Sequence, residues 1–240
     1  FSSATNAVSA RAYDAAGNAT YSAASLVLTK DISAPVAPGT PAKTRAYINL
    51  AESTGDVIIT VATSSAAAEA YTLELLYNGA SFSTPQTKSV ANGAAAQTYT
   101  FTVPGSLFSS ATNAVSARAY DAAGNIAVSA SSLTLTKDLS APSSYSASID
   151  QASFTSANAN AASFTFSGAE VDASYSYVFS STGSGVTKAD TGIVSSGDQQ
   201  ITPIDISTLA DGTITLKVTL TDLAGNPGTE YTAATRSKDA

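Results

Sequence analysis

Four residue types that carry much of enzyme and metal chemistry are missing from this chain of 240 residues: cysteine, methionine, tryptophan and histidine. Without cysteine there are no disulfide bonds, no thiol nucleophiles and no cysteine-based zinc sites. Without histidine there is no imidazole for acid–base catalysis near neutral pH. We therefore expect a protein that is not an enzyme, whose stability comes from packing and whose metal ligands, if any, are oxygen atoms.

Charge is also scarce. Only 12% of the residues are charged, and the formal net charge is −7. Nucleic acids and anionic membranes bind clustered Lys and Arg. This acidic chain has only 11 such residues against 18 Asp and Glu, so we expect no nucleic-acid partner. No apolar run approaches the roughly 20 residues that cross a bilayer, so we expect no membrane insertion of this segment. The hydrophobic content of 44% suffices for the cores of two ordinary domains.

An internal repeat organises the chain. Residues 1–18 recur unchanged at 108–125, an offset of 107 residues. The similarity continues into the sequence KD(I/L)SAP, and a diverged third copy reads TLTDLAGN followed by RSKDA. In every copy the Asp that opens a D-x-x-G-N turn precedes a second Asp by 17 residues, in the pairs Asp14 and Asp31, Asp121 and Asp138, and Asp222 and Asp239.

This spacing predicts three segments. Residues 1–34 are the last two strands of a truncated repeat, 35–138 are one complete repeat, and 139–240 are a second. Adjacent repeats of a longer chain are the expected partners. Because an isolated two-stranded hairpin is marginal in water, residues 1–34 either belong to a longer ordered array or complete a sheet of a neighbouring chain by strand addition.

Period-2 alternation of apolar residues predicts short strands separated by turns. About seven such strands per repeat indicate an all-β fold of tandem immunoglobulin-like β-sandwiches. An up-and-down barrel or a β-solenoid is the alternative, but solenoid repeats are far shorter and a barrel does not explain a proline at each boundary. The predicted buried faces include Val57/Ile59/Val61, Tyr71/Leu73/Leu75, Tyr99/Phe101/Val103, Val115/Ala117/Ala119, Leu133/Leu135, Phe164/Phe166, Tyr175/Tyr177/Phe179, Ile201/Ile204/Ile206 and Ile214/Leu216/Val218/Leu220.

Sandwich topology predicts where acidic side chains meet. The D-x-x-G-N turn joins the last two strands, so it lies at the same pole as the linker that enters the domain and as the loop after the second strand. We expect oxygen ligands to gather there at two junctions. They are Asp31, Glu69, Asp121 and Asn125 at the first, and Asp138, Glu170, Asp172, Asp222 and Asn226 at the second.

Two interpretations of these residues remain open. Converging carboxylates repel one another unless a cation lies between them, and calcium takes six to eight oxygen ligands, so calcium would tie linker and turn together. Alternatively, D-x-x-G-N is only a good turn, because Asp accepts backbone N–H groups, Gly supplies positive φ and Asn tolerates the left-handed region. The linker Lys-Asp would then be a weak surface pair.

These motifs resemble the bacterial Ig-like (BIg-type) tandem repeats of giant surface adhesins and biofilm-associated proteins. The resemblance lies in V-x-A-x-A-x-D-A-A-G-N at 115–125, in T-K-D-x-S-A-P, and in 209–226, and it covers essentially the whole chain. It implies a non-enzymatic stalk or extender, extracellular on a bacterial cell surface or secreted, stiffened by calcium at its junctions.

The resemblance carries over to the pairs Asp31 with Asp121 and Asp138 with Asp222. Since the first complete repeat has fewer acids at its pole than the second, we expect the first site to be the weaker one or empty. The competing functions are a ligand- or carbohydrate-binding module and an accessory domain of a secreted hydrolase.

Overall fold

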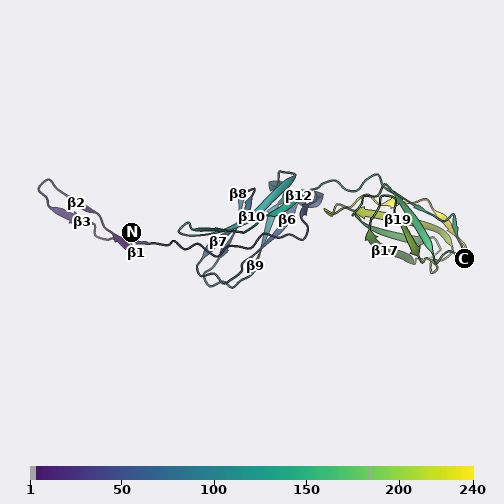
Figure 1. Ribbon diagram of the computed structural model, residues 1–240, viewed down its shortest axis with the longest axis horizontal. Helices are drawn as coiled ribbons and strands as arrows, with labels where there is room; N and C mark the ends of the chain where they lie inside the picture. The colour runs from purple at the N-terminus through teal and green to yellow at the C-terminus, as the bar shows by residue number, and fades with distance from the viewer. Residues whose placement is uncertain (1–3, 184) are drawn as a thin grey trace. The chain divides into compact units, whose positions relative to one another are not determined.

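The computed structural model describes residues 4–183 and 185–240, and almost all of its regular structure is β-strand (Figure 1). The all-β class predicted from the sequence is therefore confirmed. In the described ranges the helices are α1 (Leu50–Thr54) and the 3-10 helix η1 (Gly105–Leu107). None of the helices in these ranges combines the length and the apolar character that crossing a bilayer requires.

The chain divides into two compact units. The first comprises residues up to 43, 58–102 and 114–133, and the second comprises 44–57, 103–113 and 134–240. This division reflects spatial proximity, and the repeat boundaries at 34/35 and 138/139 stay predictions from the sequence.

The N-terminal segment forms a hairpin with two short antiparallel ladders, β1 with β4 and β2 with β3. Its apolar side chains are exposed: Val8 is 40% exposed, whereas Val115, the same residue of the identical copy, is fully buried. The local sequence is enough to form these ladders, but burial requires further strands to pack on them. The strands are β1 (Thr5–Val8), β2 (Arg11–Tyr13), β3 (Ala19–Tyr21) and β4 (Leu26–Thr29).

Residues 47–137 build a six-stranded sheet and a two-stranded sheet. The larger sheet has the order β5-β12-β10-β7-β8, with β11 paired to β10, and the smaller one pairs β6 with β9. The strands are β5 (Tyr47–Ile48), β6 (Asp56–Ala62), β7 (Tyr71–Tyr77), β8 (Ala80–Val90), β9 (Thr98–Pro104), β10 (Thr112–Asp121), β11 (Ile126–Val128) and β12 (Leu133–Lys137).

Residues 146–238 repeat this arrangement. One sheet has the order β14-β21-β19-β16-β17, with β20 paired to β19, and the other has the order β13-β15-β18. In both repeats the first strand of the large sheet pairs in parallel with the last. The strands are β13 (Ser146–Ile149), β14 (Ser153–Phe154), β15 (Ala162–Ser167), β16 (Ser174–Ser181), β17 (Thr187–Ile193), β18 (Gln200–Ile204), β19 (Gly212–Thr221), β20 (Tyr231–Thr232) and β21 (Arg236–Lys238).

Side chains from both of these sheets form one core. The ring of Phe164 on β15 lies 5.3 Å from that of Tyr177 on β16, centroid to centroid, in an edge-to-face contact. Leu216 on β19 is fully buried in the same cluster. The two sheets therefore pack face to face as a β-sandwich, as the alternation predicts.

The predicted apolar faces are the buried faces of their strands. Val57, Ile59 and Val61 on β6 are all fully buried, and so are the sets on β10 and β19 to within 1% exposure. Only members at the ends of sets are half-buried, namely Tyr99, Leu133, Tyr175 and Ile201.

The last strand of each sandwich is interrupted, so there are more strand segments than the roughly seven expected per domain. Between β11 and β12, Ser129 donates its N–H to the carbonyl of Ala117 at 2.8 Å. Its hydroxyl oxygen accepts the N–H of Ala117 at 3.1 Å, and the hydroxyl donates to the carbonyl of Ser131. A side chain thus replaces a backbone acceptor where the strand breaks.

Candidate metal centre

The turn after β10 is held by one carboxylate. Asp121 Oδ1 accepts the backbone N–H of Asn125 at 2.9 Å, and Asp121 Oδ2 accepts its side-chain amide at 2.8 Å. Gly124 has a φ of 90°, which favours glycine. The same pair of bonds joins Asp to Asn in the turns 14–18 and 222–226. All three copies therefore share one hydrogen-bonded turn.

The linker carboxylates also share one geometry. Asp31 Oδ1 accepts the N–H of Ser33 at 3.0 Å, and Asp138 Oδ1 accepts the N–H of Ser140 at 3.1 Å. Each bond spans two residues, which makes a local Asx-type turn in the linker. The second oxygen of each carboxylate takes no part in this turn.

Three of the predicted ligands come together at the first junction. One carboxylate oxygen from each of Asp31, Glu69 and Asp121 lies within 4.8 Å of the other two. The linker supplies the first, the loop between β6 and β7 the second, and the end of β10 the third. Asp121 is buried and Glu69 half-buried. Ninety residues of sequence separate the two Asp residues, and the fold brings them to one place.

The environment of this cluster shifts the pKa values of Glu69 and Asp121 in opposite directions. Burial raises the pKa of Glu69 above its usual 4.5, and the negative charges of Asp31 and Asp121 raise it further. Burial also raises the pKa of Asp121, but the hydrogen bonds from Asn125 and the turn backbone outweigh it, so this pKa lies below the usual 3.8. The cluster thus holds one carboxylate that resists ionisation beside one that favours it.

The acids of the second junction are arranged less tightly. Within the described residues, Asp138, Glu170 and Asp222 do not form a group as close as the first. Burial, followed by the charges of Asp222 and Asp138, nevertheless raises the pKa of Glu170. Asp172 is exposed, has a φ of 68° and donates its N–H to the carbonyl of Val194. The better-assembled group therefore lies at the first junction, although the sequence has more acids at the second.

The two turn asparagines differ in surroundings. Asn125 is half-buried, and its amide nitrogen donates to Asp121. Asn226 is 2% exposed, and its amide nitrogen donates to Asp222 Oδ2 and to the carbonyl of Asp138. Its Oδ1 accepts the N–H of Leu50 at 2.7 Å. The side chain of Asn226 is therefore engaged by protein groups on both of its ends.

Leu50 and its neighbour Asn49 were not identified as site residues from the sequence. Asn49 caps α1: its Oδ1 accepts the N–H of Glu52 at 2.9 Å, and Glu52 accepts the N–H of Asn49. The pattern N-x-x-E is a recognisable capping box. It locates a helix start, but nothing in the sequence places that start beside residue 226.

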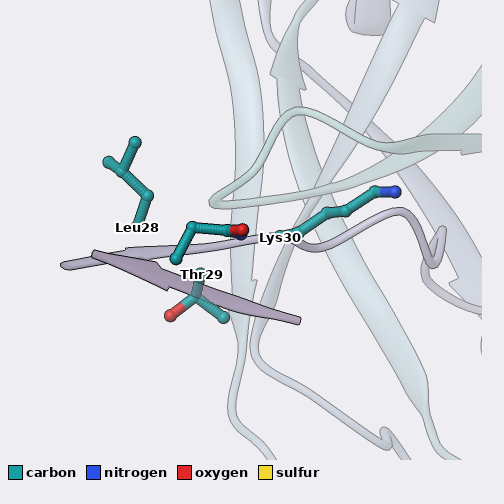
Figure 2. A pocket seen from close by; sticks show the side chains of 4 residues that line it. Leu28, Thr29 and Lys30 are labelled. Carbon is teal, nitrogen blue, oxygen red and sulfur yellow. The ribbon is translucent and has the colours of Figure 1, made fainter. Parts of the chain in front are cut away.

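A pocket on the N-terminal hairpin is a second candidate by shape. Asn6, Leu28, Thr29 and Lys30 line it, and Figure 2 shows Leu28 and Thr29 projecting to opposite sides of β4. Its described lining residues supply one amide, one hydroxyl and one ammonium group. None of them is a carboxylate, so this pocket does not match the oxygen-rich set at the first junction.

Comparison with known proteins gives structural likeness only. No protein-family model matches the chain, and no curated protein matches it. A Ca2+-stabilised adhesin with which an Antarctic bacterium reaches out and binds ice is 21% identical, with a TM-score of 0.47, over 98% of this chain and 56% of that one. A 1.5-MDa bacterial ice-binding adhesin is 20% identical, with a TM-score of 0.47, over 98% of this chain and 74% of that one.

The FN1–FN3 domains of chicken CNTN1 reach the same TM-score of 0.47 at 13% identity, over 96% of this chain and 76% of that one. Because proteins this different score alike, the likeness does not separate one function from another. The chain also spans only about half of the first adhesin structure.

Proposed function

We propose that the chain is a structural spacer, a stalk or extender of a bacterial surface adhesin or surface fibre, and that calcium stiffens it. The observation that carries the proposal is the meeting of Asp31, Glu69 and Asp121 from three separate segments. The spacer is extracellular, at the cell surface or secreted, and its partners are adjacent repeats of the same longer chain.

The spacing of the carboxylates suits calcium. Calcium–oxygen bonds are about 2.3–2.6 Å long, so ligands on opposite sides of the ion stand about 4.6–5.2 Å apart. The three oxygens lie within 4.8 Å of one another. Some point then lies within about 2.8 Å of all three oxygens, so small side-chain shifts bring them to bonding distance of one ion. Carbonyl and water oxygens would complete its shell. The pKa of Glu69 is raised first by burial and then by repulsion from Asp31 and Asp121, and two positive charges would relieve that repulsion.

The mechanical effect follows from where the ligands lie in the chain. Asp31 belongs to the linker, whereas Glu69 lies in the β6–β7 loop and Asp121 at the end of β10 in the sandwich that follows it. An ion shared among them ties the linker to the sandwich and removes freedom from the intervening residues. Asn125, which fixes Asp121 through two hydrogen bonds, orients that ligand.

We propose Asp138, Glu170 and Asp222 as a second and weaker calcium site. Asp172 joins it only if its exposed loop moves, and Asn226 contributes by holding Asp222 in place. The coupling of Glu170 to Asp222 and Asp138 supports this placement. The looser grouping is the reason to rank this site below the first.

Thermal melting of the full chain with calcium and with chelator tests the proposal. At a calcium concentration of about 100 times Kd, binding adds about 2.7 kcal/mol to the free energy of unfolding. For a sandwich of this size the melting temperature should rise by roughly 10 °C or more. Unchanged melting, together with unchanged small-angle scattering dimensions, would refute calcium stiffening. A carbohydrate-binding module would instead give glycan binding that persists with chelator.

A further inference from the structure

Asn226 joins three segments of the second compact unit. Its side-chain nitrogen donates to Asp138 O in the linker at 3.0 Å and to Asp222 Oδ2 in its own turn at 2.8 Å. Its Oδ1 accepts the N–H of Leu50, 176 residues earlier, at 2.7 Å. All of these residues belong to the same compact unit. Every polar atom of this nearly inaccessible amide therefore has a protein partner.

The surrounding contacts point the same way. Asn49 donates its side-chain amide to the carbonyl of Ala224 at 3.3 Å. Gly225 has a φ of 93°, and a Cβ added there would collide with the guanidinium of Arg45. The turn thus lies directly against the side chains of the segment 45–50, and the positive φ of residue 225 favours glycine there.

We propose that Asn226 is a docking group that binds the D-x-x-G-N turn directly to the segment 45–50, without metal. The surface formed by Arg45, Asn49 and Leu50 is the receptor, and its partner is the turn of the following repeat. This rests on the proposed spacer role, and it adds that neighbouring repeats are held by direct hydrogen bonds independently of calcium.

The three turns of the chain explain why docking uses Oδ1. In each turn the Asn side-chain nitrogen is bound by the Asp of the same turn. The oxygen is left pointing away from that bond and is the group free to recognise a partner. Among the described residues, the Oδ1 atoms of Asn18 and Asn125 accept no hydrogen bond, whereas that of Asn226 does.

The chain provides a matched position for the receptor. Asp138 donates its N–H to Ile48 O at 3.0 Å, and Asp239 donates its N–H to Phe154 O at 3.0 Å. Ser156, two residues after Phe154, is therefore the counterpart of Leu50. In the described part of the chain the Ser156 N–H has no acceptor, and the residue is exposed. A turn is docked at Leu50, whose N–H is bound by Asn226, and none is docked at Ser156 in the described part of the chain.

Amide hydrogen exchange of the full chain in chelator tests the proposal. The Leu50 N–H should exchange at least about tenfold more slowly than the Ser156 N–H after correction for sequence effects. Asn226→Ala should abolish this difference. Asn125→Ala, which breaks the same bonds within a turn but contacts no receptor, should leave it intact. Equal exchange at Leu50 and Ser156 in the unaltered chain would overturn the proposal, as would an equal effect of the two Ala variants.

A second pair of variants keeps the test decisive if Asn226→Ala unfolds. Gly225→Ala and Gly124→Ala impose similar backbone strain, with φ values of 93° and 90°, but only residue 225 faces the receptor. Gly225→Ala should speed exchange at Leu50, and Gly124→Ala should not. Since chelator is present throughout, a failure here refutes docking alone, whereas a missing calcium response in melting refutes only the calcium proposal.

Discussion

Replacing Glu69 with glutamine removes one charge from the first-junction cluster and leaves the turn intact, because Glu69 makes none of the turn's hydrogen bonds. In chelator, Glu69→Gln should melt no lower than the unaltered chain. The raised pKa of Glu69 means that its ionised form is disfavoured in the fold, first by burial and then by Asp31 and Asp121. A neutral side chain of the same shape avoids this repulsion.

With calcium, the unaltered chain should melt at a higher temperature than Glu69→Gln. The loss of one of three carboxylates should weaken binding at least about tenfold, because calcium affinity follows the charge count of the ligands. At a concentration that is about 100 times Kd for the unaltered chain, the variant would be at about 10 times its own Kd. The logarithmic dependence then leaves about half of the calcium-induced rise in melting temperature.

Calorimetric melting of both chains, with calcium and with chelator, measures these shifts. Glu230→Gln is the matched control, because Glu230 pairs with Lys217 at 2.7 Å on the surface and both side chains are about half-exposed. The control should keep the full calcium response. If Glu69→Gln lowers the melting temperature in chelator, or responds to calcium like the unaltered chain, the cluster is not a calcium site.

Two further predictions concern stability and pH. Tyr145→Phe should lower the free energy of unfolding by about 1–3 kcal/mol, because the Tyr145 hydroxyl accepts the buried N–H of Leu220 at 3.2 Å and donates to the carbonyl of Thr229. Denaturant unfolding measures this change, and a decrease of less than about 0.5 kcal/mol would contradict the prediction. Calcium affinity should fall as the pH is lowered toward 4.5, because the raised pKa of Glu69 lets a proton compete with calcium in the range just above that value. The folded chain binds more protons than the unfolded one there, so metal-free stability from this group falls as pH rises, and Asp121, whose pKa is lowered, does not titrate in this range. Calcium titrations at pH 7 and pH 4.5 check this, because metal-free Glu69 is more than half protonated at the lower pH, and equal affinity at both would exclude Glu69 as a ligand.

Strand faces with apolar alternation could be predicted from the sequence because burial on one side of a sheet imposes a period of two. Val57, Ile59 and Val61 show this. The edge strands β8 and β17 could not be found in this way, since they carry mostly exposed polar residues. The burial of Glu74 could not be predicted in this way either. Its side chain is only 3% exposed, and Arg118 on the neighbouring strand pairs with it at 2.8 Å.

The meeting of Asp31 with Asp121 could be anticipated because sandwich topology assigns each loop to a pole. Which of the two junctions brings its carboxylates closer together could not be anticipated from the sequence. A count of acids favours the second, but the distances among carboxylate oxygens depend on loop conformation, such as the left-handed backbone of Asp172. The docking of Asn226 on Leu50 was invisible for the same reason, since no sequence pattern links residues 176 positions apart.

Calcium titration calorimetry on the full chain tests the central claim most directly. The account predicts saturable binding with a Kd of about 1 mM or tighter, as in extracellular calcium modules, and a marked loss of affinity for Glu69→Gln. It also predicts unchanged affinity for Asp14→Asn, which alters an identical turn outside the cluster. No binding up to about 10 mM calcium, or equal binding by the Glu69 variant, would contradict it.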